Sequence, residues 1–162
     1  MDKSKAEKVC YDCGGQCCRS VRIAINKKEP AGEIFLEKYY AGELPEGHEL
    51  TDSVEREGNW IYDSNEEPCM FFDEETIMCT IQEKKPVICA TFPVKWKHQH
   101  SLFVSLTCPL THNVPLVDLV KSANKFKGII AKIELYNFDQ NNAEKYLSIR
   151  KLEHDYDLGV YK

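Results

Sequence analysis

The sequence predicts an α+β fold in which a cysteine-rich half of short strands and loops is followed by C-terminal helices. Two observations predict the cysteine-rich half. Short apolar runs broken by Gly, Pro and acidic residues fill positions 20–106, and all eight cysteines precede position 109. A third indicates the helices, because apolar residues recur at helical spacing after Pro115. The 162 residues have the size of one domain, with a cysteine-cluster region, 10–110, and a helical region, 111–162.

Short local patterns predict the first elements. Residues 21–25 (VRIAI) alternate apolar and polar side chains, which is typical of a strand. Residues 30–42 begin with Pro, contain Ile34, Leu36 and the Tyr39–Tyr40 pair, and end in Gly, which predicts a helix. Residues 43–58 are polar and contain Gly, Pro and Asp, so we expect a loop. Residues 59–62 (NWIY) predict a second strand.

Two hairpins and a helical turn are predicted next. In residues 69–81, two apolar runs flank an acidic turn, which indicates a hairpin. Residues 86–92 (PVICATF) lie between two prolines and predict a short helical turn or tight loop. Residues 94–96 and 102–106 predict a second hairpin across a polar turn.

The C-terminal region predicts two helices. The first begins at Pro115, has Asp118 in its first turn and bends or divides at Gly128. Its apolar positions are Leu116, Leu119, Val120, Ala123, Phe126, Ile130 and Ile133. Asn141 and Asn142 are candidate N-caps of the second helix. Its apolar face would consist of Ala143, Tyr146, Leu147, Ile149 and Leu152.

Charge and the N-terminal residues exclude several classes of protein. A net charge of −5 argues against a dedicated nucleic-acid binder, which normally carries a basic face. The first residues, MDKSKAEKVC, lack the apolar segment of a secretory signal, and no run reaches the roughly 20 apolar residues of a membrane helix. We therefore expect a cytoplasmic protein with no membrane partner. Cytoplasmic thiols stay reduced, so the cysteines indicate metal binding or catalysis before disulfides.

The cysteines are the residues that indicate chemistry. Cys10 and Cys13 have the Cys-x2-Cys spacing that lets two sulfurs of one turn reach one tetrahedral ion. Cys17 and Cys18 are adjacent, and side chains at adjacent positions point apart in both strands and helices. We therefore predict two metal centres or one multinuclear cluster. The candidate ligands are Cys10, Cys13, Cys17, Cys18, Cys69, Cys79, Cys89 and Cys108.

Other interpretations of these cysteines remain open. Eight cysteines can form four disulfides, and cysteines spread along a chain can be isolated buried thiols. A redox-active Cys-x2-Cys is a third alternative, although no thioredoxin-like βαβ pattern surrounds this one. His112 is a candidate additional ligand near Cys108, whereas His98 and His100 fit a solvated turn.

Two cysteine motifs resemble those of a known family. CYDCGGQCC at 10–18 and CTIQEKKPVICATFP at 79–93, with Cys69 and Cys108, resemble the YkgJ-like CxxCxxxCC cysteine-cluster family of zinc- or iron-chelating domains. Lys85 stands where that family usually has arginine, and Gln82 where it usually has tyrosine. The resemblance implies a cysteine-ligated zinc or iron–sulfur centre.

We therefore expect a metal-binding protein that holds zinc or an iron–sulfur cluster through eight cysteines, with the cysteine-rich half organised around the metal. The alternative is an iron–sulfur oxidoreductase or a component of a methylase-related enzyme. A related domain occurs in flagellin lysine N-methylases as part of a longer chain, but this sequence shows no separate cofactor domain for methyl transfer. The sequence indicates no particular substrate or partner.

Overall fold

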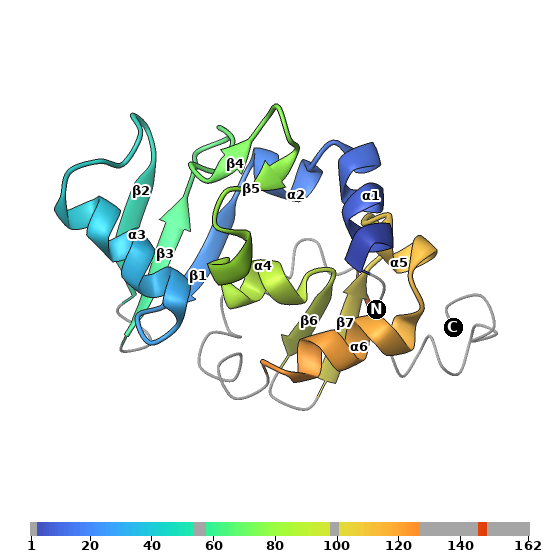
Figure 1. Ribbon diagram of the computed structural model, residues 1–162. Coiled ribbons are helices and arrows are strands. Elements are labelled where there is room, and N and C mark those ends of the chain that lie inside the picture. Colours follow the sequence, from blue (N-terminus) through green and yellow to red (C-terminus); the bar gives the residue numbers. More distant parts are fainter. Residues whose placement is uncertain (1–2, 54–57, 98–100, 127–145, 149–162) are drawn as a thin grey trace.

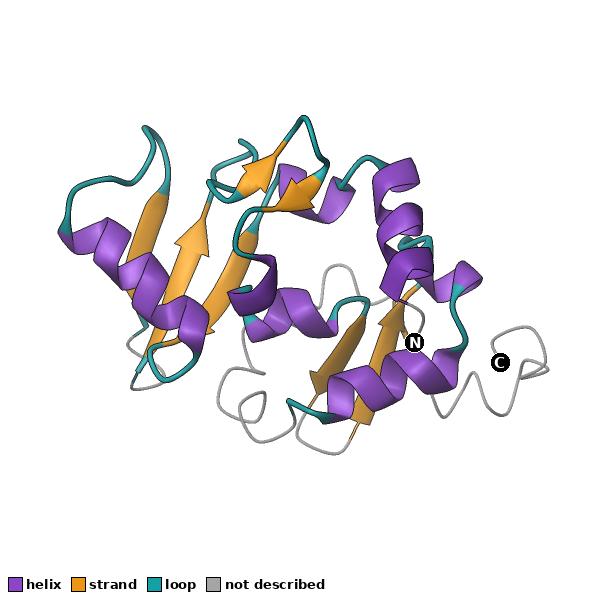
Figure 2. Cartoon of the chain, viewed as in Figure 1, coloured by secondary structure: helices purple, strands orange, loops and turns teal. Residues whose placement is uncertain are grey.

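A computed structural model describes residues 3–53, 58–97, 101–126 and 146–148 (Figure 1). Within these ranges, helices alternate with three small antiparallel sheets, which confirms the mixed α+β class (Figure 2). No helix in the described part of the chain is both long enough and apolar enough to cross a membrane.

Two helices that the sequence patterns did not predict form the N-terminal segment. α1 (Lys3–Cys13) has no buried residue and is supported by ion pairs one helical turn apart, such as Lys8–Asp12 at 2.7 Å. Its end is set by Gly14 and Gly15, whose φ angles of 77° and 66° lie in the left-handed region that favours glycine. α2 (Gln16–Arg19) follows as a single turn.

The first sheet has the strand order β1–β3–β2, and α3 packs against β1 (Figure 1). The observed elements β1 (Arg22–Asn26), β3 (Asn59–Asp63) and α3 (Pro30–Tyr40) confirm the two predicted strands and the predicted helix. The expected loop at 43–58 was wrong in part, because β2 (Glu49–Asp52) lies within it. Only Leu50 of β2 is buried, so pairing with β3 forms this strand without a local apolar pattern.

The core of this half contains an aromatic cluster under α3. Phe35 lies edge-on to Tyr62, with ring centroids 4.9 Å apart, and to Phe71 at 5.0 Å. All three rings are buried, and Ile25 and Leu50 pack in the same cluster. Such pairs add stability beyond the area that they bury, so this cluster fixes α3 against the sheet.

The predicted middle hairpin and helical turn are both present. β4 (Phe72–Asp73) pairs with β5 (Met78–Cys79), and a 3-10 turn, η1 (Gln82–Lys84), leads to α4 (Val87–Thr91). α4 packs against β1 and α6. Glu29 joins α3 to α4, because its buried carboxylate accepts hydrogen bonds from the Asn26 N–H at 3.0 Å and the Val87 N–H at 2.9 Å.

The second half is built on another antiparallel sheet. β6 (Val94–Lys97) and β7 (Ser101–Ser105) form the predicted second hairpin. A short unpredicted helix, α5 (Leu110–Asn113), precedes α6 (Leu116–Asn124), which confirms the start of the predicted C-terminal helix. The buried core here consists of Val94, Val104, Val114, Leu116, Leu119 and Ala123. The predicted bend at Gly128 lies outside the described residues.

The last predicted helix is wrong where the structure describes it. β8 (Tyr146–Ser148) is a strand that pairs with β7, with Leu147 opposite Val104. The edge of β7 offers unpaired backbone groups, and hydrogen bonding to it outweighs a weak local helical pattern. The other residues of that prediction, 141–145 and 149–152, lie outside the described part of the chain.

Candidate metal centre

Five parts of the structure carry the eight cysteines. Cys10 and Cys13 lie on α1, and Cys17 and Cys18 on α2. The remaining four lie in the β4–β5 region, on α4 and just before α5, as Cys69, Cys79, Cys89 and Cys108. All eight are free thiols, so the structure does not support the four-disulfide interpretation. Cys10 and Cys17 are exposed, and the others are half-buried.

Backbone contacts bring these segments together. The Cys69 N–H donates a hydrogen bond to the Cys18 carbonyl oxygen at 2.8 Å, which joins α2 to the loop before β4. Pairing of β4 with β5 places Cys79 opposite Phe72. α1 packs against α5, which begins two residues after Cys108 (Figure 1). The fold therefore gathers cysteines that are far apart in the sequence.

The thiols share one electrostatic neighbourhood centred on Cys17. Burial raises the pKa of five of these thiols, and the negative charge of Cys17 raises each of these pKa values further. The five are Cys10, Cys69, Cys79, Cys89 and Cys108. For Cys108 the pKa reaches about 12. The charge of Cys13 adds to the effect on Cys10 and Cys108, so all eight thiols belong to this neighbourhood.

Cys17 and Cys18 converge rather than diverge. Their sulfurs are 4.0 Å apart, so the expectation that adjacent thiols point to different sides is wrong for this one-turn helix. Their hydrogen bond lowers the pKa of Cys17 to about 7 and raises the pKa of Cys18. Two sulfurs at about 2.3 Å from one tetrahedral ion are about 3.8 Å apart. The pair is therefore close enough to serve one ion, and its spacing alone does not require two.

Lys85 supplies positive charge to this neighbourhood. Its ammonium lowers the pKa of Cys10, Cys79 and Cys89, opposing the larger effect of burial. It also lowers the pKa of Cys17, where the hydrogen bond from Cys18 has the larger effect. The sequence motif had marked Lys85 only as a departure from arginine, and the structure shows that a cation is present at this position.

Tyr62 is a neighbour of Cys69 that the sequence did not reveal. Its buried hydroxyl accepts a hydrogen bond from the Met70 N–H at 3.0 Å and lies 2.7 Å from the His48 Nδ1 atom. A hydrogen bond from the same hydroxyl lowers the pKa of Cys69, against the larger effect of burial. Such contacts orient a thiolate ligand and stabilise its charge. No motif around Tyr62 signals this role, because its three partners come from distant positions.

The donor set fits a soft metal, although the thiols are not arranged around one point. Within residues 3–53, 58–97, 101–126 and 146–148, no three His, Cys, Asp or Glu side chains form a group that could hold an ion as they stand. Eight thiols with a nearby cation match the ligand preference of zinc and iron–sulfur clusters. A bound metal would therefore draw these side chains together.

His112 does not join the candidate ligands. Its Nε2 atom is 2.8 Å from the Leu106 carbonyl oxygen, and the side chain is exposed. His98 and His100 lie outside the described residues.

A family model matches most of the chain. The model, CxxCxxCC, is described as "Putative zinc- or iron-chelating domain" and matches residues 9–109. The chain belongs to this family. The match contains all eight cysteines and confirms the resemblance that the two sequence motifs indicated. Neither the curated proteins nor the solved structures contain a match to this chain.

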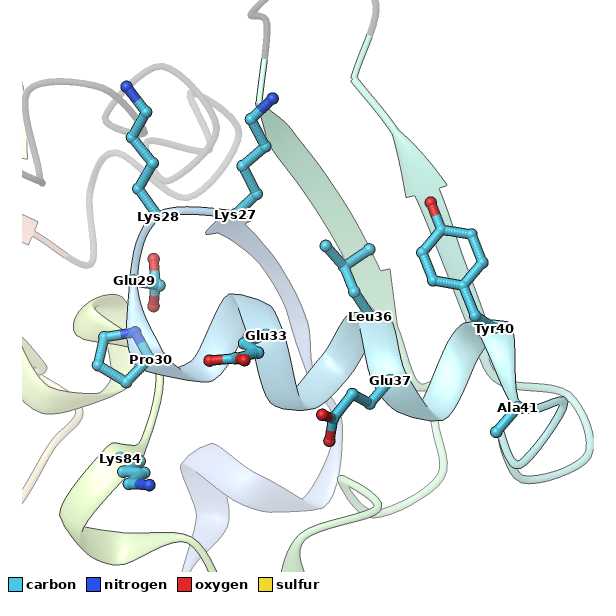
Figure 3. A pocket seen from close by; sticks show the side chains of 10 residues that line it. All are labelled: Lys27, Lys28, Glu29, Pro30, Glu33, Leu36, Glu37, Tyr40, Ala41 and Lys84. Carbon is cyan, nitrogen blue, oxygen red and sulfur yellow. The ribbon is translucent and has the colours of Figure 1, made fainter.

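A pocket elsewhere on the molecule contains no cysteine. It lies along α3, and Figure 3 shows Lys27 and Lys28 extending from the turn before this helix. Its lining residues are Lys27, Lys28, Glu29, Pro30, Glu33, Leu36, Glu37, Tyr40, Ala41 and Lys84. Both charge signs line the pocket, so it shows no preference for a ligand of one charge.

Proposed function

We propose that this chain is a zinc-binding protein whose eight cysteines are all ligands. The observation that carries the proposal is that the fold gathers cysteines far apart in the sequence. The Cys69 N–H donates to the Cys18 carbonyl oxygen, α1 packs against α5 beside Cys108, and the Cys17 and Cys18 sulfurs are 4.0 Å apart. Zinc would supply a tetrahedral cross-link between these segments and no redox chemistry. Reduced thiols suit the cytoplasm, where we place the protein.

We further propose that the eight thiols bind two ions. The first site would consist of Cys10, Cys13, Cys17 and Cys108. The second would consist of Cys18, Cys69, Cys79 and Cys89. Packing of α1 on α5 supports the first set, and the hydrogen bond from Cys69 to the Cys18 carbonyl supports the second. The two sites would meet at Cys17 and Cys18, whose sulfurs are 4.0 Å apart.

Elemental analysis of anaerobically purified protein tests both the binding of zinc and the number of ions. We expect a colourless protein with about two zinc ions per chain, one for each set of four thiolates. The double variants Cys10→Ser with Cys108→Ser, and Cys69→Ser with Cys89→Ser, should each remove one ion. Protein that binds no metal under reducing conditions would refute the proposed function. A double variant that keeps both ions would refute only the division into two sites.

An iron–sulfur centre is the second candidate. The observation that favours it is the exposure of Cys10 and Cys17, because a site open to solvent can exchange electrons or ligands with other molecules. Iron–sulfur clusters are also held by cysteine thiolates, and the protein would then serve redox or methylase-related chemistry. A brown anaerobic preparation containing iron and sulfide would support this candidate over zinc.

A further inference from the structure

Arg19 makes three contacts that join separate parts of the candidate metal centre. Its Nε atom donates a hydrogen bond to the Gly14 carbonyl oxygen at 2.9 Å. One terminal nitrogen donates to the Glu74 carboxylate at 3.2 Å, although the two residues are 55 positions apart. Its guanidinium carbon lies 5.2 Å from the centre of the Phe72 ring, within the range of a cation–π contact.

These contacts close the turn between α1 and α2 against the β4–β5 hairpin. The same Phe72 ring packs against Gly15 so tightly that a Cβ atom added to Gly15 would be 2.7 Å from the ring atom Cε2. Arg19 therefore holds the Gly14–Gly15 turn against the hairpin, and the Phe72 ring of the hairpin packs on Gly15.

Candidate ligands lie on both sides of this contact. Cys17 and Cys18 precede Arg19 on α2, and Cys69 and Cys79 belong to the hairpin region. We propose that Arg19 is a positioning residue of the metal centre, which fixes the distance between the Cys17–Cys18 pair and the hairpin cysteines and thereby sets the affinity for metal. This inference rests on the proposed metal-binding function.

The chemistry of the guanidinium suits this position. A planar guanidinium can stack on an aromatic ring while its nitrogen atoms donate in fixed directions, which the ammonium of lysine cannot do. The ion pair with Glu74 is exposed and contributes little by itself, because solvent screens such pairs. The hydrogen bond to Gly14 and the contact with Phe72 therefore account for most of the positioning.

Zinc affinity of full-length variants tests the inference. Competition with a chromogenic chelator would measure the affinity, and the absorption spectrum of cobalt-loaded protein would report the arrangement of the thiolates. Arg19→Ala should weaken zinc binding about tenfold or more, the usual effect of losing a residue that orients a ligand, and should alter the cobalt spectrum. Arg19→Lys should recover only part of the affinity. Arg22 is the matched control, since it is exposed and contacts Asp63 rather than the hairpin.

Each outcome separates this inference from the proposed function. Wild-type affinity and an unchanged cobalt spectrum in Arg19→Ala would overturn the role of Arg19, as would an equal loss in Arg22→Ala. A wild-type chain that binds neither zinc nor cobalt would overturn the metal function and the inference with it. If Arg19→Ala does not fold, Arg19→Lys and Phe72→Leu give the same test, because the first removes the planar group that stacks and the second removes the ring on which it stacks.

Discussion

The backbone N–H of Cys69 donates a hydrogen bond to the carbonyl oxygen of Cys18, with 2.8 Å between nitrogen and oxygen. This bond joins the N-terminal cysteine segment to the β4–β5 region. In contrast, the β1–β3–β2 sheet is held by the aromatic cluster of Phe35, Tyr62 and Phe71. The N-terminal cysteine segment, α1 and α2, is therefore held by a backbone hydrogen bond, whereas the sheet is held by aromatic packing.

Metal removal should loosen the cysteine segment before the sheet. The binding free energy of a structural metal is part of the folding free energy, so chelation removes it from the segments that the metal joins. Hydrogen exchange should show a loss of protection at the Cys69 amide, while the amides that pair β1 with β3 keep more of theirs. Equal exchange throughout residues 10–108 with and without chelator would show that the metal does not stabilise the fold.

Two neighbouring glycines provide a matched test of the turn that Arg19 holds. Gly14 and Gly15 both have positive φ angles, but an added Cβ meets nothing within 4 Å at Gly14 and lies 2.7 Å from Phe72 Cε2 at Gly15. Gly14→Ala should cost about 1–2 kcal/mol of unfolding free energy, the usual strain of this conformation. Gly15→Ala should cost about 1–3 kcal/mol more, through overpacking. Urea unfolding measures both, and equal losses would contradict the close packing of Gly15 on Phe72.

Local patterns were sufficient to predict β1, β3 and α3, because VRIAI and NWIY are short apolar runs and α3 has a proline at its start. The observed burial of β1 does not alternate, since Ala24, Ile25 and Asn26 are all buried. The sequence patterns did not predict β2 and β8, because each forms by pairing with a neighbouring strand. Leu50 is the only buried residue of β2, and Tyr146–Ser148 pairs with β7. Strand pairing between distant residues leaves little signal in a short window of sequence.

The candidate ligands could be identified from cysteine spacing, but their surroundings could not. The contacts of Arg19 with Glu74 and of Tyr62 with Met70 depend on how the hairpin folds back on earlier segments. The convergence of Cys17 and Cys18 also depends on the one-turn helix α2, which begins at the positive φ of Gly15. Sequence spacing therefore indicated the candidate metal ligands, and the three-dimensional contacts indicate which other residues position them.

Loss of the Tyr62 hydroxyl should destabilise the region of Cys69. Tyr62→Phe keeps the ring packing on Phe35 but leaves the Met70 N–H and the His48 ring without this partner. We expect a loss of about 1–3 kcal/mol in the free energy of unfolding, measured in urea, because a half-buried donor loses its acceptor. His48→Ala is the control and should cost less, since it removes only one of these contacts. An unchanged stability in Tyr62→Phe would show that water replaces the hydroxyl.

Glu29 should contribute to the pH dependence of stability. Burial raises its pKa above the ordinary value of 4.5, although the N–H groups of Asn26 and Val87 oppose this effect. The folded chain therefore retains this proton at pH values where the unfolded chain has released it. The free energy of unfolding should fall as pH rises from 4.5 toward the pKa of the folded state.

The Glu29→Gln variant isolates this contribution. Glutamine does not titrate, so the fall in stability above pH 4.5 should be smaller in this variant than in the wild type. Glu33→Gln is the control, because Glu33 is exposed on the first turn of the same helix. Urea unfolding at a series of pH values measures the slope. If Glu29→Gln and the wild type have the same slope, the carboxylate of Glu29 does not titrate in the way its burial requires.

Cys17 should be the most reactive thiol of the reduced, metal-free chain near neutral pH. Its side chain is exposed, and the hydrogen bond with Cys18 lowers its pKa to about 7, while Cys18 stays protonated. The rate at which iodoacetamide alkylates Cys17, followed by peptide mass spectrometry, should therefore reach half of its high-pH maximum near pH 7. Cys18→Ala removes the hydrogen-bond donor and should shift this midpoint toward the ordinary thiol value of 9.0, whereas Cys13→Ala should leave it in place. An unshifted midpoint in Cys18→Ala would mean that the charge of Lys85, rather than the adjacent thiol, sets the reactivity of Cys17.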